Sequence, residues 1–137
     1  MARLSRPADL ARLFAALADP TRLRLLNLMT GREVCVCYFA EILKEGQPKI
    51  SRHLAYLRRA GVVEARREGK WMHYRLKERE DRDAASILQA TVASFKANRQ
   101  MQNDLARLAD ATCTPQRFVT LQGAPVPTEF RSGQIKK

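Results

Sequence analysis

The stretch PKISRHLAYLRRAG, residues 48–61, has the spacing of an amphipathic helix with a cationic outer face. On a helical wheel Ile50, Leu54 and Leu57 fall together, and a stripe of this kind is expected to face a core. The opposite side carries basic and hydrogen-bonding side chains, namely Lys49, Arg52, Tyr56 and Arg59, with Ser51 and His53 on its flanks. A basic face on an isolated helix is usually only solvated, so its meaning depends on the segments around it.

The segments before this stretch predict three helices. The first, over residues 7–19, has four apolar side chains on one face, which are Leu10, Leu13, Phe14 and Leu17. The second is expected over residues 20–29, with Asp19 as its N-cap and Gly31 as its left-handed stop. A short third helix over residues 38–43 precedes the break KEGQP. A short helix, a Gly-containing turn and a helix with a polar outer face follow the order of a helix-turn-helix, whose second helix enters the major groove.

Residues 62–76, VVEARREGKWMHYRL, predict a β-hairpin that turns at Glu68 and Gly69, with Arg67 paired to Lys70. This register divides the ribbon into two faces, one with Val63, Ala65, Met72 and Tyr74 and the other with Glu64, Arg66, Trp71, His73 and Arg75. The cations near the tip are Arg66, Arg67 and Lys70. A basic hairpin tip directly after a recognition helix is placed to contact DNA phosphates, which predicts a winged helix-turn-helix.

Residues 83–108 predict one long helix with apolar side chains along one broad side. A helix of about 26 residues is longer than a small core covers. We expect it to form a dimer interface together with the first helix, because a winged helix that reads two half-sites works as a two-fold dimer. The alternative is a single amphipathic helix that folds back on its own core.

The expected organisation is one domain and a tail. Residues 1–113 are predicted to form a winged-helix domain for DNA binding and dimerisation, mainly α-helical with a small β-hairpin. Beyond Pro115 the chain is rich in proline and glycine, so residues 114–137 are predicted to form a flexible C-terminal tail.

Charge and composition restrict the class of partner. The chain of 137 residues has 25 lysines and arginines against 14 acidic residues, a formal net charge of +11, which favours a polyanion such as nucleic acid. No stretch is apolar enough to span a bilayer or to act as a signal peptide, so we expect a cytoplasmic protein without a membrane partner. Three cysteines, an odd number, argue against a disulfide framework and suit a reducing compartment.

The segment EVCVCYFAEIL, residues 33–43, places Cys35 and Cys37 one residue apart. Two thiolates suit a soft ion, and we expect that holding one ion between them requires a local bend of the chain. His53 and His73 lie on the predicted DNA-reading elements, where a groove or surface role is expected. With no base predicted beside a thiol and no Gly-rich phosphate loop, the chain is not expected to be an enzyme. Two inert buried thiols, or oxidative pairing with Cys113, remain alternatives.

Four motifs in order, LADPTRLRLLNLM, EVCVCYFAEIL, QPKISRHLAYLRRAGVV and REGKWMHYRL, resemble the ArsR/SmtB family of metal-sensing winged-helix repressors over about residues 8–80. The second motif is similar to the arsenic-sensor branch. The resemblance implies a homodimeric repressor that binds double-stranded operator DNA and is released by arsenite, antimonite or a methylated trivalent arsenical. Cys35 and Cys37 would be thiolate ligands, and the operator would face the region from Gln47 to His53, with Lys49, Ser51 and Arg52.

The chain departs from the arsenic-branch pattern at the third thiol. Where that pattern often has Asp, Leu and a third Cys, this sequence has Tyr38, Phe39 and Ala40. Cys113 is the remaining candidate for a third ligand, from the same subunit or from the other. A methylated arsenical, which needs two sulfurs, is an alternative inducer. A thiol-redox-responsive repressor and a ligand-independent DNA-binding module are the alternative functions.

Overall fold

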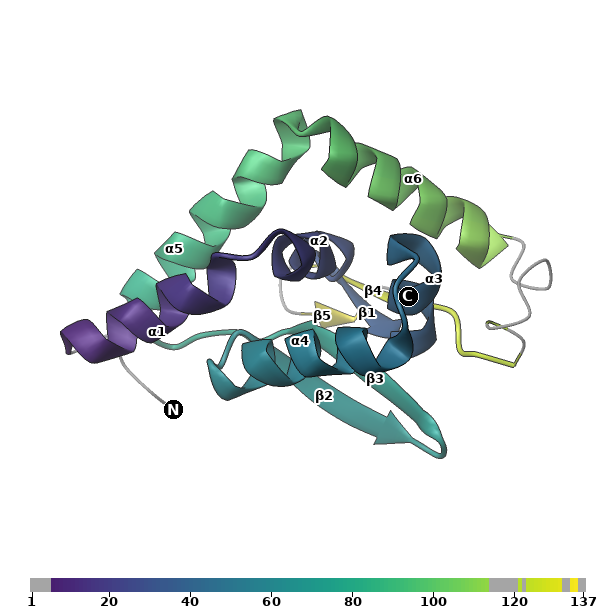
Figure 1. Cartoon of the computed structure of the whole chain (residues 1–137), viewed down its shortest axis with the longest axis horizontal. Coiled ribbons are helices and arrows are strands. Elements are labelled where there is room, and N and C mark those ends of the chain that lie inside the picture. Colours follow the sequence, from purple (N-terminus) through teal and green to yellow (C-terminus); the bar gives the residue numbers. More distant parts are fainter. Residues whose placement is uncertain (1–5, 114–120, 122, 132–133, 136–137) are drawn as a thin grey trace.

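The structure is a computed structural model, and it describes residues 6–113, 121, 123–131 and 134–135. The chain is mainly helical, with an antiparallel sheet formed by β1 (Arg32–Cys35), β2 (Val63–Glu68), β3 (Trp71–Leu76), β4 (Thr128–Arg131) and β5 (Gln134–Ile135). The strand order is β2-β3-β1-β4-β5 (Figure 1). The helices around the winged-helix core are α1 (Pro7–Leu17), α2 (Pro20–Leu28), α3 (Val36–Leu43) and α4 (Gln47–Arg59). No helix in these described ranges is long and apolar enough to cross a membrane.

The predicted helix-turn-helix is confirmed. The side chains of Ile50, Leu54 and Leu57 on α4 are fully buried, and α4 packs against both α2 and α3. The Asp19 carboxylate accepts a hydrogen bond from the backbone N–H of Arg22 at 3.0 Å, which caps the start of α2 as predicted. The sequence pattern therefore places the recognition helix on the core through the expected apolar stripe.

The thiol segment begins as a strand, which the sequence did not predict. Strand β1 (Arg32–Cys35) pairs antiparallel with β3 (Trp71–Leu76), with Val34 opposite Tyr74 and Cys35 opposite His73. Helix α3 follows at once, two residues earlier than expected. A strand of four residues is too short for a clear alternating pattern, so only its pairing with β3 identifies it.

The hairpin of β2 (Val63–Glu68) and β3 is confirmed, but its predicted register is wrong. Glu68 pairs with Trp71 and Arg67 with Met72, so the two turn residues are Gly69 and Lys70. Gly69 has φ +60°, the positive φ required at the first turn position of a type II′ hairpin. Because the register differs by two residues, the predicted division of side chains between the two faces is unchanged.

The predicted long helix is wrong as one element. It is divided into α5 (Arg82–Ala93), a 3₁₀ turn η1 (Ser94–Ala97) and α6 (Arg99–Cys113), which meet at an angle in Figure 1. Asn98 is extended, with φ −96° and ψ 122°, and its side chain accepts a hydrogen bond from the Met101 N–H at 3.0 Å. Helix α6 then packs on α2 and α3 and buries Met101 and Leu108. The second half of the predicted dimer helix therefore folds back on its own core.

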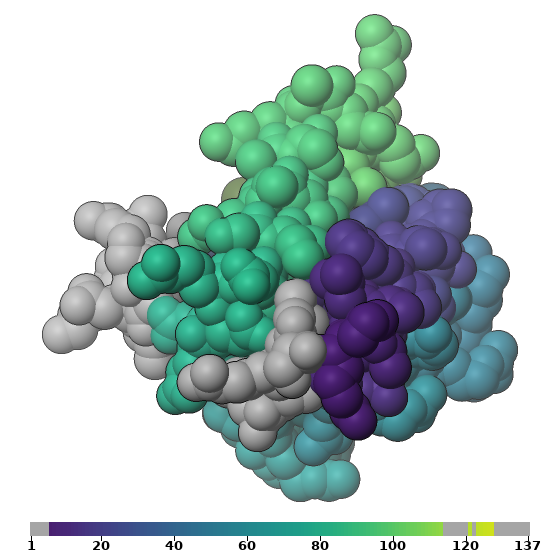
Figure 2. All heavy atoms as spheres, turned by 90° about the vertical axis from the view of Figure 1, so that its left-hand side faces the viewer, coloured from purple at the N-terminus to yellow at the C-terminus, as the bar shows by residue number. Residues whose placement is uncertain are grey.

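The first helix divides its apolar face between the core and the surface. Leu13 and Leu17 are buried, whereas Leu10 is 36% exposed and Phe14 is 50% exposed. Only Ala84 of α5 is fully buried. Figure 2 shows α1 and α5 on the same face of the molecule.

Part of the C-terminal segment, for which the sequence predicts a flexible tail, pairs with the sheet in the described residues. Strand β4 (Thr128–Arg131) pairs with β1, with Arg32 opposite Glu129, and β5 (Gln134–Ile135) pairs with β4. Leu121 is 1% exposed, and Gly123 lies beside the Trp71 ring. The free edge of β1 provides backbone partners for this segment. Residues 114–120, 122, 132–133 and 136–137 of the predicted tail lie outside the described residues.

Candidate functional site

The outer face of α4 presents most of the predicted DNA-contacting side chains to solvent. The exposed ones are Gln47, Lys49, Ser51, Arg52 and Arg59. The Lys49 ammonium forms an ion pair with Glu45 at 3.2 Å. This face therefore offers cations and hydrogen-bond donors opposite the buried stripe, which is the arrangement that direct readout in a major groove needs.

His53 and Tyr56, also predicted to face DNA, are half-buried. Both contact Arg22, which was not among the predicted site residues. The Arg22 guanidinium lies 4.1 Å from the centre of the Tyr56 ring, and its Nη1 is 3.3 Å from His53 Nδ1. Arg22 also donates to the carbonyls of Ala15 and Ala16 at the end of α1. One side chain thus connects α1, α2 and α4. Its place in the first turn of α2 was visible in the sequence, but its partners were not.

The three cations predicted at the wing tip have different surroundings in the structure. Arg67 and Lys70 are exposed, and the Lys70 ammonium lies 5.0 Å from the centre of the Trp71 ring. Arg66 instead forms a two-point ion pair with Glu33 on β1, with Nη2 2.6 Å from Oε1 and Nε 3.1 Å from Oε2. The bond from Arg66 keeps the pKa of the buried Glu33 carboxyl below its usual value. Arg66 is therefore held against the sheet by a partner within the chain.

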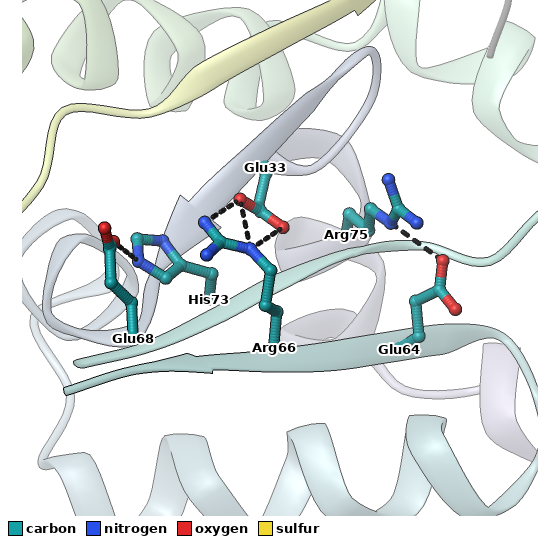
Figure 3. A network of polar contacts seen from close by, with 6 residues as sticks. All are labelled: Glu33, Glu64, Arg66, Glu68, His73 and Arg75. Carbon is teal, nitrogen blue, oxygen red and sulfur yellow. Dashed lines mark hydrogen bonds and ion pairs between the residues drawn. The ribbon is translucent and has the colours of Figure 1, made fainter. Parts of the chain in front are cut away.

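Two ion pairs and one hydrogen bond form a row across one face of the wing sheet, as Figure 3 shows. Besides Glu33 and Arg66, the row contains Arg75 with Glu64 at 2.7 Å and His73 with Glu68 at 2.8 Å. His73 is only 3% exposed, so the expectation of a groove or surface histidine is wrong. Its position opposite Cys35 in the sheet explains the burial, because cross-strand partners lie on the same face.

The two predicted thiol ligands lie together in the core. The Cys37 S–H donates to the Cys35 sulfur with the Sγ atoms 3.4 Å apart, and the two residues are 2% and 0% exposed. Cys35 is the last residue of β1, with φ −71° and ψ 142°, and Cys37 is in the first turn of α3. The change from strand to helix between the two residues is the local bend that is required to hold one ion between them. Two sulfurs at this separation can both lie about 2.3 Å from one ion.

The two thiols differ in the direction in which their pKa is shifted. The hydrogen bond from Cys37 lowers the pKa of the Cys35 thiol to about 6, against the opposing effect of burial, and the nearby His73 adds to the lowering. The same hydrogen bond, followed by burial, raises the pKa of Cys37. The pair therefore favours one thiolate and one thiol, and the thiolate is the form that binds soft ions.

Cys113 does not complete this pair within one chain. It is exposed at the end of α6, and the described residues contain no group of three His, Cys, Asp or Glu side chains able to hold a metal ion. Next to Cys37, however, Tyr38 is fully buried and its hydroxyl has no hydrogen-bond partner. Burial raises the pKa of this phenol, and the charges of Cys37 and Cys35 raise it further.

The chain is similar to known proteins over the helix-turn-helix and over a longer part of its sequence. The family model described as bacterial regulatory protein, arsR family, matches residues 19–65. The chain is 52% identical over 65 residues to the arsenical resistance operon repressor of Escherichia coli K12, an alignment that covers 47% of this chain and 56% of that relative. It is 41% identical over 105 residues to the arsenic resistance transcriptional regulator ArsR1 of Pseudomonas putida KT2440, covering 75% of this chain and 80% of that protein.

A solved structure gives the same fold. The chain is similar to the transcriptional repressor BigR from Xylella fastidiosa with a TM-score of 0.57 and 34% sequence identity, over 67% of this chain and 88% of that chain. The similarity leaves about a third of the present chain without a counterpart in that structure.

Proposed function

We propose that this chain, which belongs to the ArsR family of bacterial regulatory proteins, is a transcriptional repressor that leaves its operator when trivalent arsenic or antimony binds Cys35 and Cys37. The observation that carries the proposal is the buried thiol pair, with sulfurs 3.4 Å apart, at the start of a helix packed on the recognition helix. The arsenic-related functions named for the relatives in Escherichia coli and Pseudomonas putida support the choice of inducer.

The DNA-binding surface in this proposal combines α4 and the wing tip. Exposed polar side chains from Gln47 to Arg59 read base edges, and Arg52 is at the centre of that face. Arg67 and Lys70 contact phosphates, which position the protein without reading sequence. Arg22 holds α4 in place through His53 and Tyr56 rather than by contacting DNA itself.

We further propose that two copies bind one operator as a homodimer. Helix α1, which carries the exposed Leu10 and Phe14, and helix α5, of which only Ala84 is fully buried, lie on one face of a single chain. A two-fold dimer through this face presents two recognition helices to two half-sites. The proposed interface does not use α6, whose buried side chains pack on the chain's own core.

Two connections link the thiol pair to the DNA-binding surface. Helix α3, which begins with Val36 and contains Cys37, packs directly on α4. Cys35 is paired with His73 on β3, and His73 in turn contacts Glu68 next to the wing turn. An ion that replaces the S–H···S hydrogen bond changes the position of both elements. A coupling energy of about 1–3 kcal/mol is typical of such a linkage between two sites.

The 3.4 Å separation also favours a second candidate, a redox-responsive repressor in which Cys35 and Cys37 are oxidised to a disulfide. A methylated trivalent arsenical is the alternative inducer, since two sulfurs suffice to hold it. A third sulfur from Cys113 of a second copy of the chain is the alternative to a two-sulfur site, because Cys113 is exposed at the end of α6.

The test is fluorescence anisotropy of the reduced protein on a labelled fragment of its own promoter, at fixed salt, during titration with arsenite. We expect release at near-stoichiometric arsenite for the wild type. We expect no release for Cys35→Ser or Cys37→Ser, although both variants still bind the fragment. Normal release of either variant would show that the ligand assignment is wrong. Release by peroxide but not by arsenite would support the redox candidate instead.

A further inference from the structure

The Tyr38 hydroxyl is a buried polar group that makes no hydrogen bond in the fold. It is 0% exposed, and its hydroxyl is one of two buried side-chain polar atoms without a hydrogen-bond partner in the described part of the chain. Such groups are unfavourable, because the hydroxyl gave up its hydrogen bonds to water on folding. A phenylalanine would fill the same space without this cost. An unpaired buried hydroxyl is therefore a candidate for a group that acquires its partner from a ligand.

Tyr38 also adjoins the thiol pair in the chain. It directly follows Cys37 in α3, and the charges of Cys37 and Cys35 add to burial in raising the pKa of its phenol. Within one chain the described structure provides two thiols but no third residue of the kinds that hold a metal ion. Two buried sulfurs and, on the next residue, a buried hydroxyl that makes no hydrogen bond are thus the groups from which a site can be built.

We propose that the Tyr38 hydroxyl is the third group of the inducer site, and that it donates a hydrogen bond to the oxygen that arsenic keeps after binding both thiols. This inference rests on the proposed function and deepens it. It selects inorganic arsenite, which retains such an oxygen, over organic arsenicals, which do not.

The reaction balances with two sulfurs. Arsenous acid carries three hydroxyl groups on trivalent arsenic. Two As–O bonds break and two As–S bonds form, to the Cys35 thiolate and to Cys37; the Cys37 proton leaves with one hydroxide as water, and the hydroxide displaced by Cys35 takes a proton from the solvent. Arsenic stays trivalent and keeps one hydroxyl group. In a buried site that remaining oxygen needs a hydrogen-bond donor, and Tyr38 has one available.

The discriminating variant is Tyr38→Phe, tested with two arsenicals on the full-length reduced protein by isothermal titration calorimetry without DNA. Arsenite keeps an oxygen at the third position of arsenic, whereas phenylarsine oxide bound to two thiols has carbon there. We expect Tyr38→Phe to bind arsenite about five- to tenfold more weakly, the effect of losing one hydrogen bond. Its affinity for phenylarsine oxide should be unchanged.

Tyr74→Phe is the matched control, because Tyr74 lies on the opposite face of β3 from His73, the partner of Cys35. We expect it to bind both arsenicals like the wild type. Thermal unfolding of Tyr38→Phe should occur at or above the wild-type temperature, since the change removes an unpaired buried polar atom.

Three outcomes would overturn the proposal. Unchanged arsenite affinity in Tyr38→Phe would show that the hydroxyl makes no bond to the inducer. An equal loss for both arsenicals would indicate a packing effect. A loss of a hundredfold or more in Cys113→Ser would place a third sulfur where the oxygen is proposed. Failure of the wild type to bind either arsenical is a separate result, which would reject the proposed function itself.

Discussion

Arg24 on α2 and Asp104 on α6 form a two-point ion pair, with Nε 2.8 Å from one carboxylate oxygen and Nη2 3.0 Å from the other. The Asp104 side chain is completely buried, and Gln100 donates a further hydrogen bond to it. The pair raises the pKa of Arg24, so the guanidinium stays charged. This contact holds the C-terminal helix on the helix-turn-helix core.

The ion pair predicts a large loss of stability for Asp104→Ala. Removing one partner of a buried pair leaves the other charge without compensation, so we expect the free energy of unfolding to fall by about 3 kcal/mol. Urea unfolding followed by circular dichroism measures this. Asn103→Ala, on the exposed side of the same helix, should change it by less than about 0.5 kcal/mol. Similar values for the two variants would show that α6 is held by apolar contacts alone.

The thiol pair predicts an unusual titration. Because the hydrogen bond from Cys37 lowers the pKa of Cys35 to about 6, ultraviolet thiolate absorbance should rise as the pH increases through that value, below the range of an ordinary cysteine. Cys37→Ala removes the S–H donor, so the step should move to higher pH. Cys113→Ser should leave it in place. A wild-type curve with only ordinary cysteine steps would argue against the shared proton.

We expect the substitution Arg52→Ala to cause the main loss of sequence-specific DNA binding. It is exposed at the centre of the outer face of α4, so Arg52→Ala should keep the fold and weaken operator binding by about 1–3 kcal/mol. The measurement is competition between operator and unrelated DNA at one salt concentration. Arg58→Ala, on the flank of the same helix, should affect both DNAs alike. Unchanged discrimination in Arg52→Ala would reject α4 as the recognition helix.

The wing cations should differ in salt dependence. Lys70 is exposed at the tip, so Lys70→Ala should lower the slope of log affinity against log salt by about one unit. Arg66 is bound to Glu33, so Arg66→Ala should mainly lower stability, because the buried Glu33 carboxylate loses its partner. Lys96→Ala, an exposed cation on η1, serves as the control. An equal decrease of the slope for Arg66 and Lys70 would mean that Arg66 leaves Glu33 to contact phosphate.

The exposed face of α1 leads us to expect a dimer that a charge on this face disrupts. Phe14 is half-exposed in one chain, so Phe14→Glu should leave the fold intact and place a charge in the proposed dimer interface. We expect a monomer in sedimentation velocity and weaker operator binding, because two half-sites are no longer bound by one particle. Asn103→Glu adds the same charge to α6 and should remain dimeric. A dimeric Phe14→Glu variant would require another interface.

Local patterns in the sequence predict the elements that carry their own periodicity. The stripe of Ile50, Leu54 and Leu57 identifies α4, and the alternation in the hairpin assigns its faces correctly although the register is shifted. The Cys-Val-Cys segment indicates a thiol site for the same reason, since the residue types and their spacing are present in a few neighbouring positions. Each of these depends on residues close together in the chain.

By itself, then, the sequence determined the winged helix-turn-helix, its basic outer faces and the pair of thiols. Only the tertiary structure decided that β1 is a strand, that the long helix breaks at Asn98, and that Arg66 is bound to Glu33. It also decided that His73 lies buried opposite Cys35 and that the Tyr38 hydroxyl has no partner. These features depend on contacts between residues distant in the chain, and a polar side chain acquires a role only when its neighbours in space are known.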